Sequence, residues 1–409
     1  MVKPRLAEKG DGTMGVETLN IEIPHHLNRH ELFVPALKDL CVKVVAENFV
    51  LQPSFGSLDR ENKAKVVDLL SLELPLELVG PVIEEEVYWK RRSLSRWSNC
   101  ELSAHGDSWK QLYFEKNLAH TLENFDPVND DLEELKRLLA FSSPWVYNLN
   151  IKQLPSHMDL QVLLSPSLLS NLFFLKLTYG RQNVGMDYEQ SLFGMKLSDC
   201  VSMARALEWT ETLTYLNLSS NLLDDDRVKM IASGIAENKS ISHLDLSHNK
   251  IADRGVKALA SLLDRRSVLV FLNLRSNQIH VEGGRAIARA LKSNRSLLSL
   301  NLSLNRIGDD GCKSIIEAAT SNESLTSLNL SATAAGQGST MALGNLIRQN
   351  TSLTHVDASC NDFGEEGGAI VSEALETNKT LQHIDVRMSN VGENHESAIS
   401  EMLKSRITF

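Results

Sequence analysis

Two pairs of histidine and aspartate residues near the end of the chain are suited to bind a metal or transfer a proton. His355 and Asp357 lie two residues apart, and His383 and Asp385 repeat that spacing 28 residues later. Imidazole and carboxylate groups are both metal ligands, and histidine changes charge near neutral pH. On neighbouring strands, such side chains more often form hydrogen-bonded ladders or part of a protein-binding surface. We therefore predict no metal here and treat the four residues as candidates for partner binding.

Other motifs that resemble catalytic or ligand-binding sites are incomplete. GDDGCKS at residues 308–314 resembles a phosphate-binding loop, but that pattern requires glycine directly before the lysine, where Cys312 stands here. His26 and His30 have the spacing of metal ligands on a helix, but no carboxylate or cysteine accompanies them at ligand spacing. The chain contains neither GxSxG nor HExxH. We predict no enzyme activity, no cofactor, no metal and no small-molecule substrate.

The composition argues against several classes of protein. Hydrophobic residues make up 42% and charged residues 23% of the 409 residues, which is typical of a folded chain. The net charge is −10 and no segment is strongly basic, so we expect no nucleic-acid binding. No apolar run is long enough to span a bilayer, and residues 1–16 lack the apolar core of a secretory signal. The five cysteines are widely separated, which indicates a reducing compartment such as the cytoplasm.

A repeat of 28 residues dominates the sequence. The pattern LxxLxLxxN and its variants occur seven times, starting at residues 213, 241, 269, 297, 325, 353 and 381. This is the leucine-rich repeat pattern. Its alternating leucines predict a short strand with one buried face, and apolar residues at helical spacing follow, as in Val228–Ile235. We predict an α/β leucine-rich repeat solenoid of the ribonuclease-inhibitor-like class, with a helix on the convex side of each repeat and one continuous core.

The asparagine that closes each pattern ends the strand. Its side chain is expected to satisfy backbone groups between neighbouring turns. The fifth repeat departs from the pattern, because Thr333 replaces this asparagine and small residues follow it.

The remaining patterns suggest further divisions of the chain. We predict a mobile tail over 1–20, a helical N-terminal capping domain over 21–144, degenerate repeats with an insertion over 145–212, and seven regular leucine-rich repeats over 213–409. The degenerate repeats start at Val146 and Leu172, and the insertion includes residues 185–195. A capping domain is expected because the end of a solenoid otherwise exposes its core.

The alternation along each strand also predicts which side chains form the concave surface. Repeats stack about 5 Å apart, so Tyr215, His243 and Phe271 should form a ladder, with Arg275 beside it. Exposed aromatic and arginine side chains are typical anchors of protein interfaces. The candidate partner-binding residues on this face are Tyr215, Asn217, His243, Asp245, Phe271, Asn273, Arg275, His355, Asp357, His383, Asp385 and Arg387.

A basic segment, KRRSLSR at residues 90–96, lies between Trp89 and Trp97 and follows three glutamates. It is either a docking site for an acidic partner or a solvated helix face with charges paired at i, i+4, and we favour the second interpretation. Trp89, Trp97 and Trp109 complete the set of candidate partner-binding residues.

Segments outside the repeats resemble a known family. YW at 88–89, RW at 96–97, HGDSWKQLYFEKNL at 105–118, GMDYEQSLF at 185–193 and LSDC at 197–200 are together similar to the T-complex-associated testis-expressed family. That family is subunit 5 of the nexin–dynein regulatory complex of motile cilia. The resemblance implies a non-enzymatic scaffold in the link between axonemal doublet microtubules, where the complex restrains sliding and helps regulate dynein.

The same resemblance implies a location and a set of partners. The location is the cytoplasm and cytoskeleton, in the axoneme of a cilium or flagellum. The partners are other subunits of the complex, namely another leucine-rich repeat subunit and coiled-coil subunits. No nucleic acid or membrane is implied.

Two other functions remain open from the residues alone. LPLELVGPVI at 74–83, followed by RW at 96–97, resembles an F-box with shortened spacing, which suggests a substrate receptor of a ubiquitin ligase. A GTPase-activating protein of the Ran class uses the same repeat type. Those proteins end in a long acidic tail, whereas this sequence ends in KSRITF.

Overall fold

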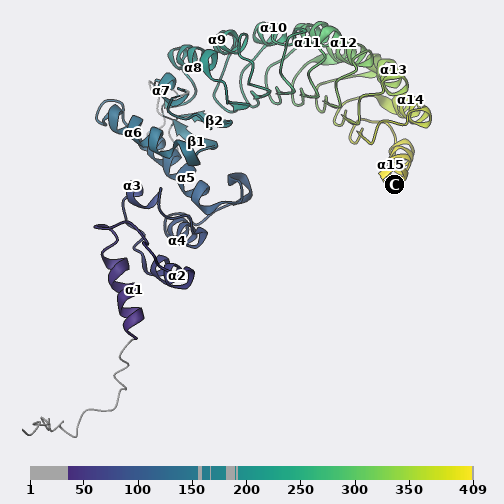
Figure 1. Cartoon of the computed structure of the whole chain (residues 1–409). Helices are drawn as coiled ribbons and strands as arrows, with labels where there is room; N and C mark the ends of the chain where they lie inside the picture. The colour runs from purple at the N-terminus through teal and green to yellow at the C-terminus, as the bar shows by residue number, and fades with distance from the viewer. Residues whose placement is uncertain (1–35, 155–158, 166, 181–188, 190–191, 408–409) are drawn as a thin grey trace, which may run out of the picture. The chain divides into compact units, whose positions relative to one another are not determined.

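The computed structural model describes residues 36–154, 159–165, 167–180, 189 and 192–407 (Figure 1). The predicted tail over 1–20, the His26–His30 pair and most of the insertion at 185–195 lie outside these residues. The chain divides into two compact units, Met1–Ser71 and Leu72–Phe409.

The described part of the first unit contains two helices, α1 (Leu37–Glu47) and α2 (Arg60–Leu69). Asp59 caps α2, because its carboxylate accepts a hydrogen bond from the Asn62 N–H at 2.8 Å. The buried Phe49 ring lies 5.3 Å from the ring of Phe55. Local apolar contacts and a side-chain cap therefore hold this unit together.

The second unit begins with four helices around an aromatic cluster. The helices are α3 (Leu76–Val79), α4 (Glu86–Arg96), α5 (Trp109–Asn124) and α6 (Leu132–Ser142). The ring of Trp89 lies 5.3 to 5.5 Å from the rings of Tyr88, Tyr113 and Phe114. All four rings are buried, so the segments between 88 and 114 form the core of this region.

A parallel sheet follows, and its strand order is the order of the chain. The described strands are β1 (Asn148–Leu154), β2 (Phe174–Tyr179), β3 (Tyr215–Asn217), β4 (His243–Asp245), β5 (Phe271–Asn273), β6 (Ser299–Asn301), β7 (Ser327–Asn329), β8 (His355–Asp357) and β9 (His383–Asp385). From β3 onward they start at intervals of 28 residues, and buried residues of successive strands, such as Leu244 and Leu272, are paired in register. The predicted α/β leucine-rich repeat solenoid is confirmed.

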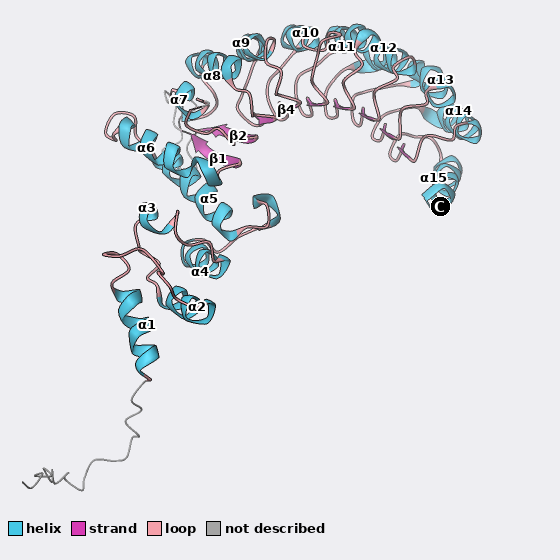
Figure 2. Ribbon diagram, viewed as in Figure 1, coloured by secondary structure: helices cyan, strands magenta, loops and turns pink. Residues whose placement is uncertain are grey.

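A helix follows most strands and covers the other side of the sheet. The helices are α7 (Leu160–Leu163), α8 (Leu197–Trp209), α9 (Asp225–Ile235), α10 (Asp253–Ser261), α11 (Val281–Ser293), α12 (Gly308–Thr320), α13 (Thr340–Gln349), α14 (Gly364–Thr377) and α15 (Glu393–Ile407). Figure 2 shows the helices of the repeats along the outer side of the array and the strands along its inner side. The inner side is therefore the concave surface predicted from the sequence.

The segment that resembles a phosphate-binding loop is part of an ordinary repeat helix. Residues 308–314 form the start of α12, and the Gly308 N–H donates to the Thr333 carbonyl at 3.0 Å. Cys312 faces the core, and burial raises the pKa of its thiol to about 11. A buried thiol with a raised pKa is an inert packing group at neutral pH.

The asparagines at the strand ends join neighbouring repeats, as predicted. The Asn305 side chain donates to the carbonyls of Leu274 and Leu302, both at 2.9 Å, and accepts from the Ile279 N–H at 3.1 Å. In the fifth repeat, the Thr333 hydroxyl instead donates to the Leu330 carbonyl of its own repeat at 2.7 Å. Among the described residues, no hydrogen bond joins this hydroxyl to the Leu302 carbonyl of the repeat before.

A second row of asparagines stands where the helices end and the chain turns back toward the sheet. Its members are Asn238, Asn294, Asn322, Asn350 and Asn378, and we call them the helix-end ladder. Asn322 illustrates their role: its amide donates to the carbonyls of Leu291 and Asn294 at 2.9 and 3.1 Å, and its oxygen accepts from the Ser324 and Leu325 N–H groups. The side chain of Asn322 therefore donates to the preceding repeat and accepts within its own turn.

Helix α5 covers the open edge of the first strand, β1. The buried carboxylate of Glu115 accepts from the N–H groups of Tyr147 and Asn148 at 2.8 and 2.7 Å, and Glu123 accepts from the Lys152 N–H at 2.7 Å. These acceptors take the place of a preceding strand. Because α5 packs on β1, helices α3 to α6 belong to the compact unit of the repeats. The structural boundary at Ser71 therefore divides the range 21–144 for which we predict one helical domain.

Candidate protein-binding surface on the concave face

Four aromatic rings form a continuous stack on the concave face. Phe174, Tyr215, His243 and Phe271 occupy the same register position on β2 to β5, and we call them the aromatic ladder. Their ring centroids lie 4.7, 5.5 and 5.9 Å apart in chain order, and adjacent rings are inclined by 19 to 28°. Parallel strand pairing in register produces this stack, because side chains at one register position align along the sheet.

The ladder includes one residue, Phe174, that is not among the predicted partner-binding residues. Phe174 stands at the third position of the degenerate repeat LFFLKLTYG, the position that Tyr215, His243 and Phe271 occupy in the regular repeats. Alignment of that degenerate repeat with the regular ones is therefore sufficient to predict that Phe174 belongs to the ladder.

The ladder is half-buried and uncharged at neutral pH. Burial lowers the pKa of His243 below its usual value of 6.5 and raises the pKa of Tyr215, to which Asp245 also contributes. A stack of neutral rings whose outer faces and edges remain accessible is suited to contact apolar, aromatic or arginine side chains.

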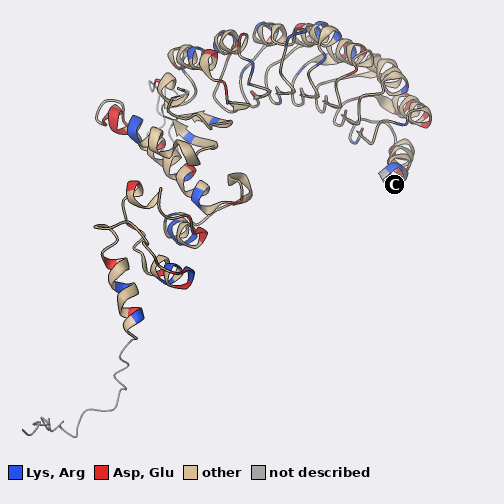
Figure 3. Ribbon diagram, in the orientation of Figure 1, with Lys and Arg blue, Asp and Glu red and all other residues tan. Residues whose placement is uncertain are grey.

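Apolar side chains just before the strands widen this surface. Phe173 is 44% exposed, Leu298 42% and Tyr147 36%; they directly precede β2, β6 and β1. Figure 3 shows the charged residues of the repeats mainly on the helices and few along the strands. The side of the array that carries the ladder is therefore less charged than the helical side, as expected for a contact surface.

The predicted residues at the fifth repeat position have structural contacts of their own. The oxygens of Asn217 and Asp245 accept from the N–H groups of Ser219 and Ser247, both at 2.9 Å, and Asn273 donates to Asp245 at 3.1 Å. Asn217 and Asp245 are buried, which leaves little of either for a partner. Arg275 is exposed, and its guanidinium lies 3.4 Å from the hydroxyl of Ser303.

The second predicted patch lies at the other end of the same face. The rings of His355 and His383 stack 6.0 Å apart and are exposed. Hydrogen bonds from Arg387 lower the pKa of Asp385, and Asp357 accepts from the Asn329 amide at 2.9 Å. Within the described ranges, no group of three or more His, Cys, Asp or Glu residues is placed to hold a metal ion. The aspartates belong to turns and ladders of the array.

The three tryptophans differ in their accessibility. Trp89 is 0% exposed and its indole N–H donates to the Ile83 carbonyl at 2.9 Å, so its selection as a partner-binding residue was wrong. Trp97 is half-buried between the cations of Arg96 and Lys116, which lie 4.9 and 5.5 Å from its ring. Trp109 is half-buried beside Lys90, at 5.7 Å. Trp97 and Trp109 remain candidates.

The basic segment on α4 is only partly a solvated face. Arg92 is buried, and its guanidinium donates to the Leu74 carbonyl at 2.7 Å and to the Tyr88 hydroxyl at 3.2 Å. Arg96 donates to the Tyr113 hydroxyl at 3.0 Å and to the Asn117 side chain at 2.6 Å. The interpretation of a solvated face was therefore wrong for Arg92, whose long side chain reaches acceptors within the helical region, whereas Arg96 makes such contacts and stays exposed.

Comparison with known proteins identifies the repeat and names relatives. A sequence profile described as Leucine Rich repeat matches residues 237–260, 267–288, 293–315 and 349–369. The dynein regulatory complex subunit 5 of Chlamydomonas reinhardtii is 55% identical over 197 residues, which are 48% of this chain and 50% of that protein. The mouse and human proteins of the same name are 33% and 32% identical over 50% of this chain and 46% of theirs. The chain thus spans about half the length of the curated relatives it matches.

Solved structures with similar chain paths share little sequence with this protein. An internalin from Listeria monocytogenes is 22% identical with a TM-score of 0.35, over 60% of this chain and 62% of that one. Actin-binding site 2 of leiomodin-1 is 17% identical with a TM-score of 0.32, over 38% of this chain and 88% of that one. Structural similarity with such low sequence identity and TM-scores supports no inference about function.

In the described part of the chain, no helix is both long and apolar enough to cross a lipid bilayer. The resemblance predicted from the segments outside the repeats is confirmed by the named relatives. The chain carries leucine-rich repeats, and curated proteins similar to about half of it are named dynein regulatory complex subunit 5.

Proposed function

We propose that this chain is a non-enzymatic scaffold subunit of a dynein regulatory complex. In this proposal it lies in the axoneme of a cilium or flagellum, contributes to the link between doublet microtubules, and helps regulate motility. The observation that carries the proposal is the 55% identity over 197 residues to a protein named dynein regulatory complex subunit 5. Its partners are other subunits of that complex, including another leucine-rich repeat subunit and coiled-coil subunits.

The fold suits a scaffold because neighbouring repeats share one core and two rows of asparagine hydrogen bonds. A surface on such an array keeps its shape when a partner binds, so little conformational entropy is lost. We propose that the aromatic ladder, with Arg275 at its edge, anchors a partner, and that Trp97 and Trp109 form a second contact. The histidine pair on β8 and β9 is a lesser candidate, because it has two rings where the ladder has four.

The test is purification of a tagged copy of the chain from ciliated cells, with mass spectrometry of detergent-treated and salt-extracted axonemes. We expect the chain to stay with axonemes after detergent and to be recovered with other dynein regulatory subunits. Recovery from the soluble fraction with a ligase adaptor and a cullin would contradict the proposal and support the F-box alternative. Recovery with the GTPase Ran would support the other alternative.

A further inference from the structure

The helix-end ladder is broken at one repeat. The register places residue 266 between Asn238 and Asn294, and this residue is arginine. Two residues later, Val268 stands where the neighbouring repeats have Ser240 and Ser296. The repeat therefore lacks both the ladder amide and the hydroxyl that accompanies it.

Two backbone groups lose their partners at this break. In the intact repeats, the ladder amide donates to the carbonyl of the preceding ladder asparagine, as Asn322 does to Asn294 at 3.1 Å. Its oxygen accepts from the N–H two residues later, as Asn238 does from Ser240 at 2.8 Å. At the break, among the described residues, neither the Asn238 carbonyl nor the Val268 N–H has a hydrogen-bond partner. The Ser267 hydroxyl accepts a hydrogen bond from the Leu269 N–H at 3.2 Å and does not accept one from the Val268 N–H.

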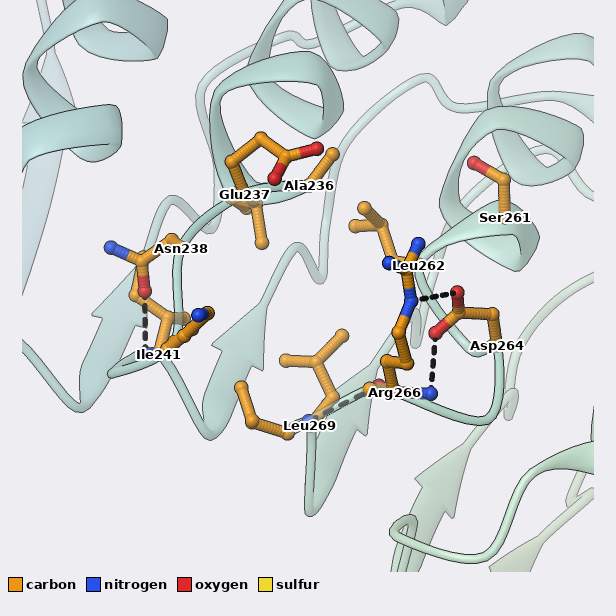
Figure 4. Close-up of a pocket in the computed structure, with 13 residues that line it drawn as sticks. Ala236, Glu237, Asn238, Ile241, Ser261, Leu262, Asp264, Arg266 and Leu269 are labelled. Atoms are coloured by element: carbon orange, nitrogen blue, oxygen red, sulfur yellow. Dashed lines mark hydrogen bonds and ion pairs between the residues drawn. The ribbon is translucent and has the colours of Figure 1, made fainter.

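The missing side chain leaves a cavity of about 230 Å³ at this place, which we call the ladder gap. Figure 4 shows Asn238 on one side of the ladder gap and Arg266 with Asp264 on the other. Ile241, Leu262 and Leu269 supply buried apolar walls. Arg266 is directed to Asp264, with its Nε 3.6 Å from the carboxylate, and is 92% exposed, so it does not fill the cavity.

We propose that the ladder gap binds a side-chain amide, glutamine or asparagine, from a partner polypeptide. An amide donates one hydrogen bond and accepts another in the arrangement that Asn322 uses two repeats further along the array. A carboxylate has no donor for the Asn238 carbonyl, and an ammonium or guanidinium group has no acceptor for the Val268 N–H. The apolar walls accommodate the methylene groups. This inference does not depend on the assignment to a dynein regulatory complex.

The test compares two isosteric probes on the full chain. N-acetyl-glutamine-N′-methylamide and N-acetyl-glutamate-N′-methylamide share a backbone and differ only in the side-chain amide. We expect the glutamine probe to give saturable shifts of the Val268 and Leu269 amide signals in ¹⁵N-resolved spectra, and the glutamate probe to bind several-fold more weakly. Equal or tighter binding of the glutamate probe would overturn the inference, because Lys239 and Arg266 at the rim would then act by charge. No response to either probe would overturn it as well.

A variant that completes the ladder provides a second readout. Arg266→Asn combined with Val268→Ser restores the residues of the intact repeats, so we expect a higher melting temperature and loss of the glutamine response. Arg265→Asn is the matched control, because it removes one positive charge from the adjacent exposed residue and leaves the cavity open. A glutamine response that survives in a folded Arg266→Asn, Val268→Ser variant would place the binding elsewhere and overturn the proposal.

Discussion

The two halves of the concave face have the same framework and different surfaces. Strands β2 to β5 carry the four stacked rings of the aromatic ladder, whereas β6 and β7 carry Ser299 and Ser327 at the same register position. The leucines beneath them are buried alike in both halves. The core and the asparagines specify the repeat, and the outward third position is free to vary because it contributes little to either. The exposed third position therefore differs between the halves while the buried leucines do not, and this difference is the basis on which we propose the aromatic ladder as a partner contact.

The largest effect is expected from a charge in the shared core. Leu244→Asp in β4 and Leu302→Asp after β6 each place a carboxylate at a fully buried position, so each should destabilise the fold by about 4 kcal/mol or more. Chemical denaturation followed by circular dichroism measures this. Ser299→Asp, on the outward side of β6, is the control and should have little effect. Unchanged stability in Leu302→Asp would show that the strand register is wrong.

The next effect concerns the asparagines that join the repeats in both halves. Asn305→Ala removes the donor to the Leu274 and Leu302 carbonyls and the acceptor of the Ile279 N–H. Asn277 still donates to Leu274, so the Leu302 carbonyl and the Ile279 N–H are left unpaired, and we expect a loss of about 2–3 kcal/mol. Asn301→Ala, at the half-exposed fifth position of the same repeat, should cost less than about 1 kcal/mol, because its contacts are within its own turn. Equal losses in thermal and urea unfolding would contradict the distinction between framework and surface.

A third prediction separates the two halves by binding. Tyr215→Ala and Phe271→Ala should each weaken retention of the tagged chain on axonemes, by about tenfold to a hundredfold in affinity if the ladder is an anchor. Ser327→Ala, at the same register position in the other half, should leave retention unchanged. His355→Ala tests the histidine pair. A stronger loss in His355→Ala than in Phe271→Ala would move the anchor to β8 and β9.

The smallest expected effect is a dependence of the fold's stability on pH that arises from His243 in the aromatic ladder. Burial lowers the pKa of His243 in the folded chain below the 6.5 of an unperturbed histidine. Between these two pKa values the unfolded chain binds more protons, so stability is intact above about pH 6.5 and falls as the pH decreases below it. His243→Phe should remove this part of the dependence when melting temperatures are compared between about pH 8 and about pH 5. If the melting temperatures of the original chain and of His243→Phe changed with pH in the same way, the assignment of this pH dependence to His243 would be wrong.

Much of the repeat region was predictable because its signals are local and periodic. The 28-residue period located β3 to β9, and the alternation within each strand identified Tyr215, His243 and Phe271 as outward neighbours. The joining role of the strand-end asparagines followed in the same way. The failures lie where the period is absent or incomplete. Trp89 is buried although we predict a surface anchor there, because composition alone does not distinguish a buried tryptophan from an exposed one.

The sequence by itself therefore determined the repeat unit, its buried leucines and the order of side chains along the concave face. The reason is that strand alternation and a fixed period decide which way each residue points before any distant contact forms. Only the tertiary structure decided that Glu115 and Glu123 cover the edge of β1, that Arg92 and Arg96 turn to acceptors in the helical region, and that the break at Arg266 opens a cavity. Those features depend on pairs of groups far apart in the chain, whose meeting no local pattern encodes.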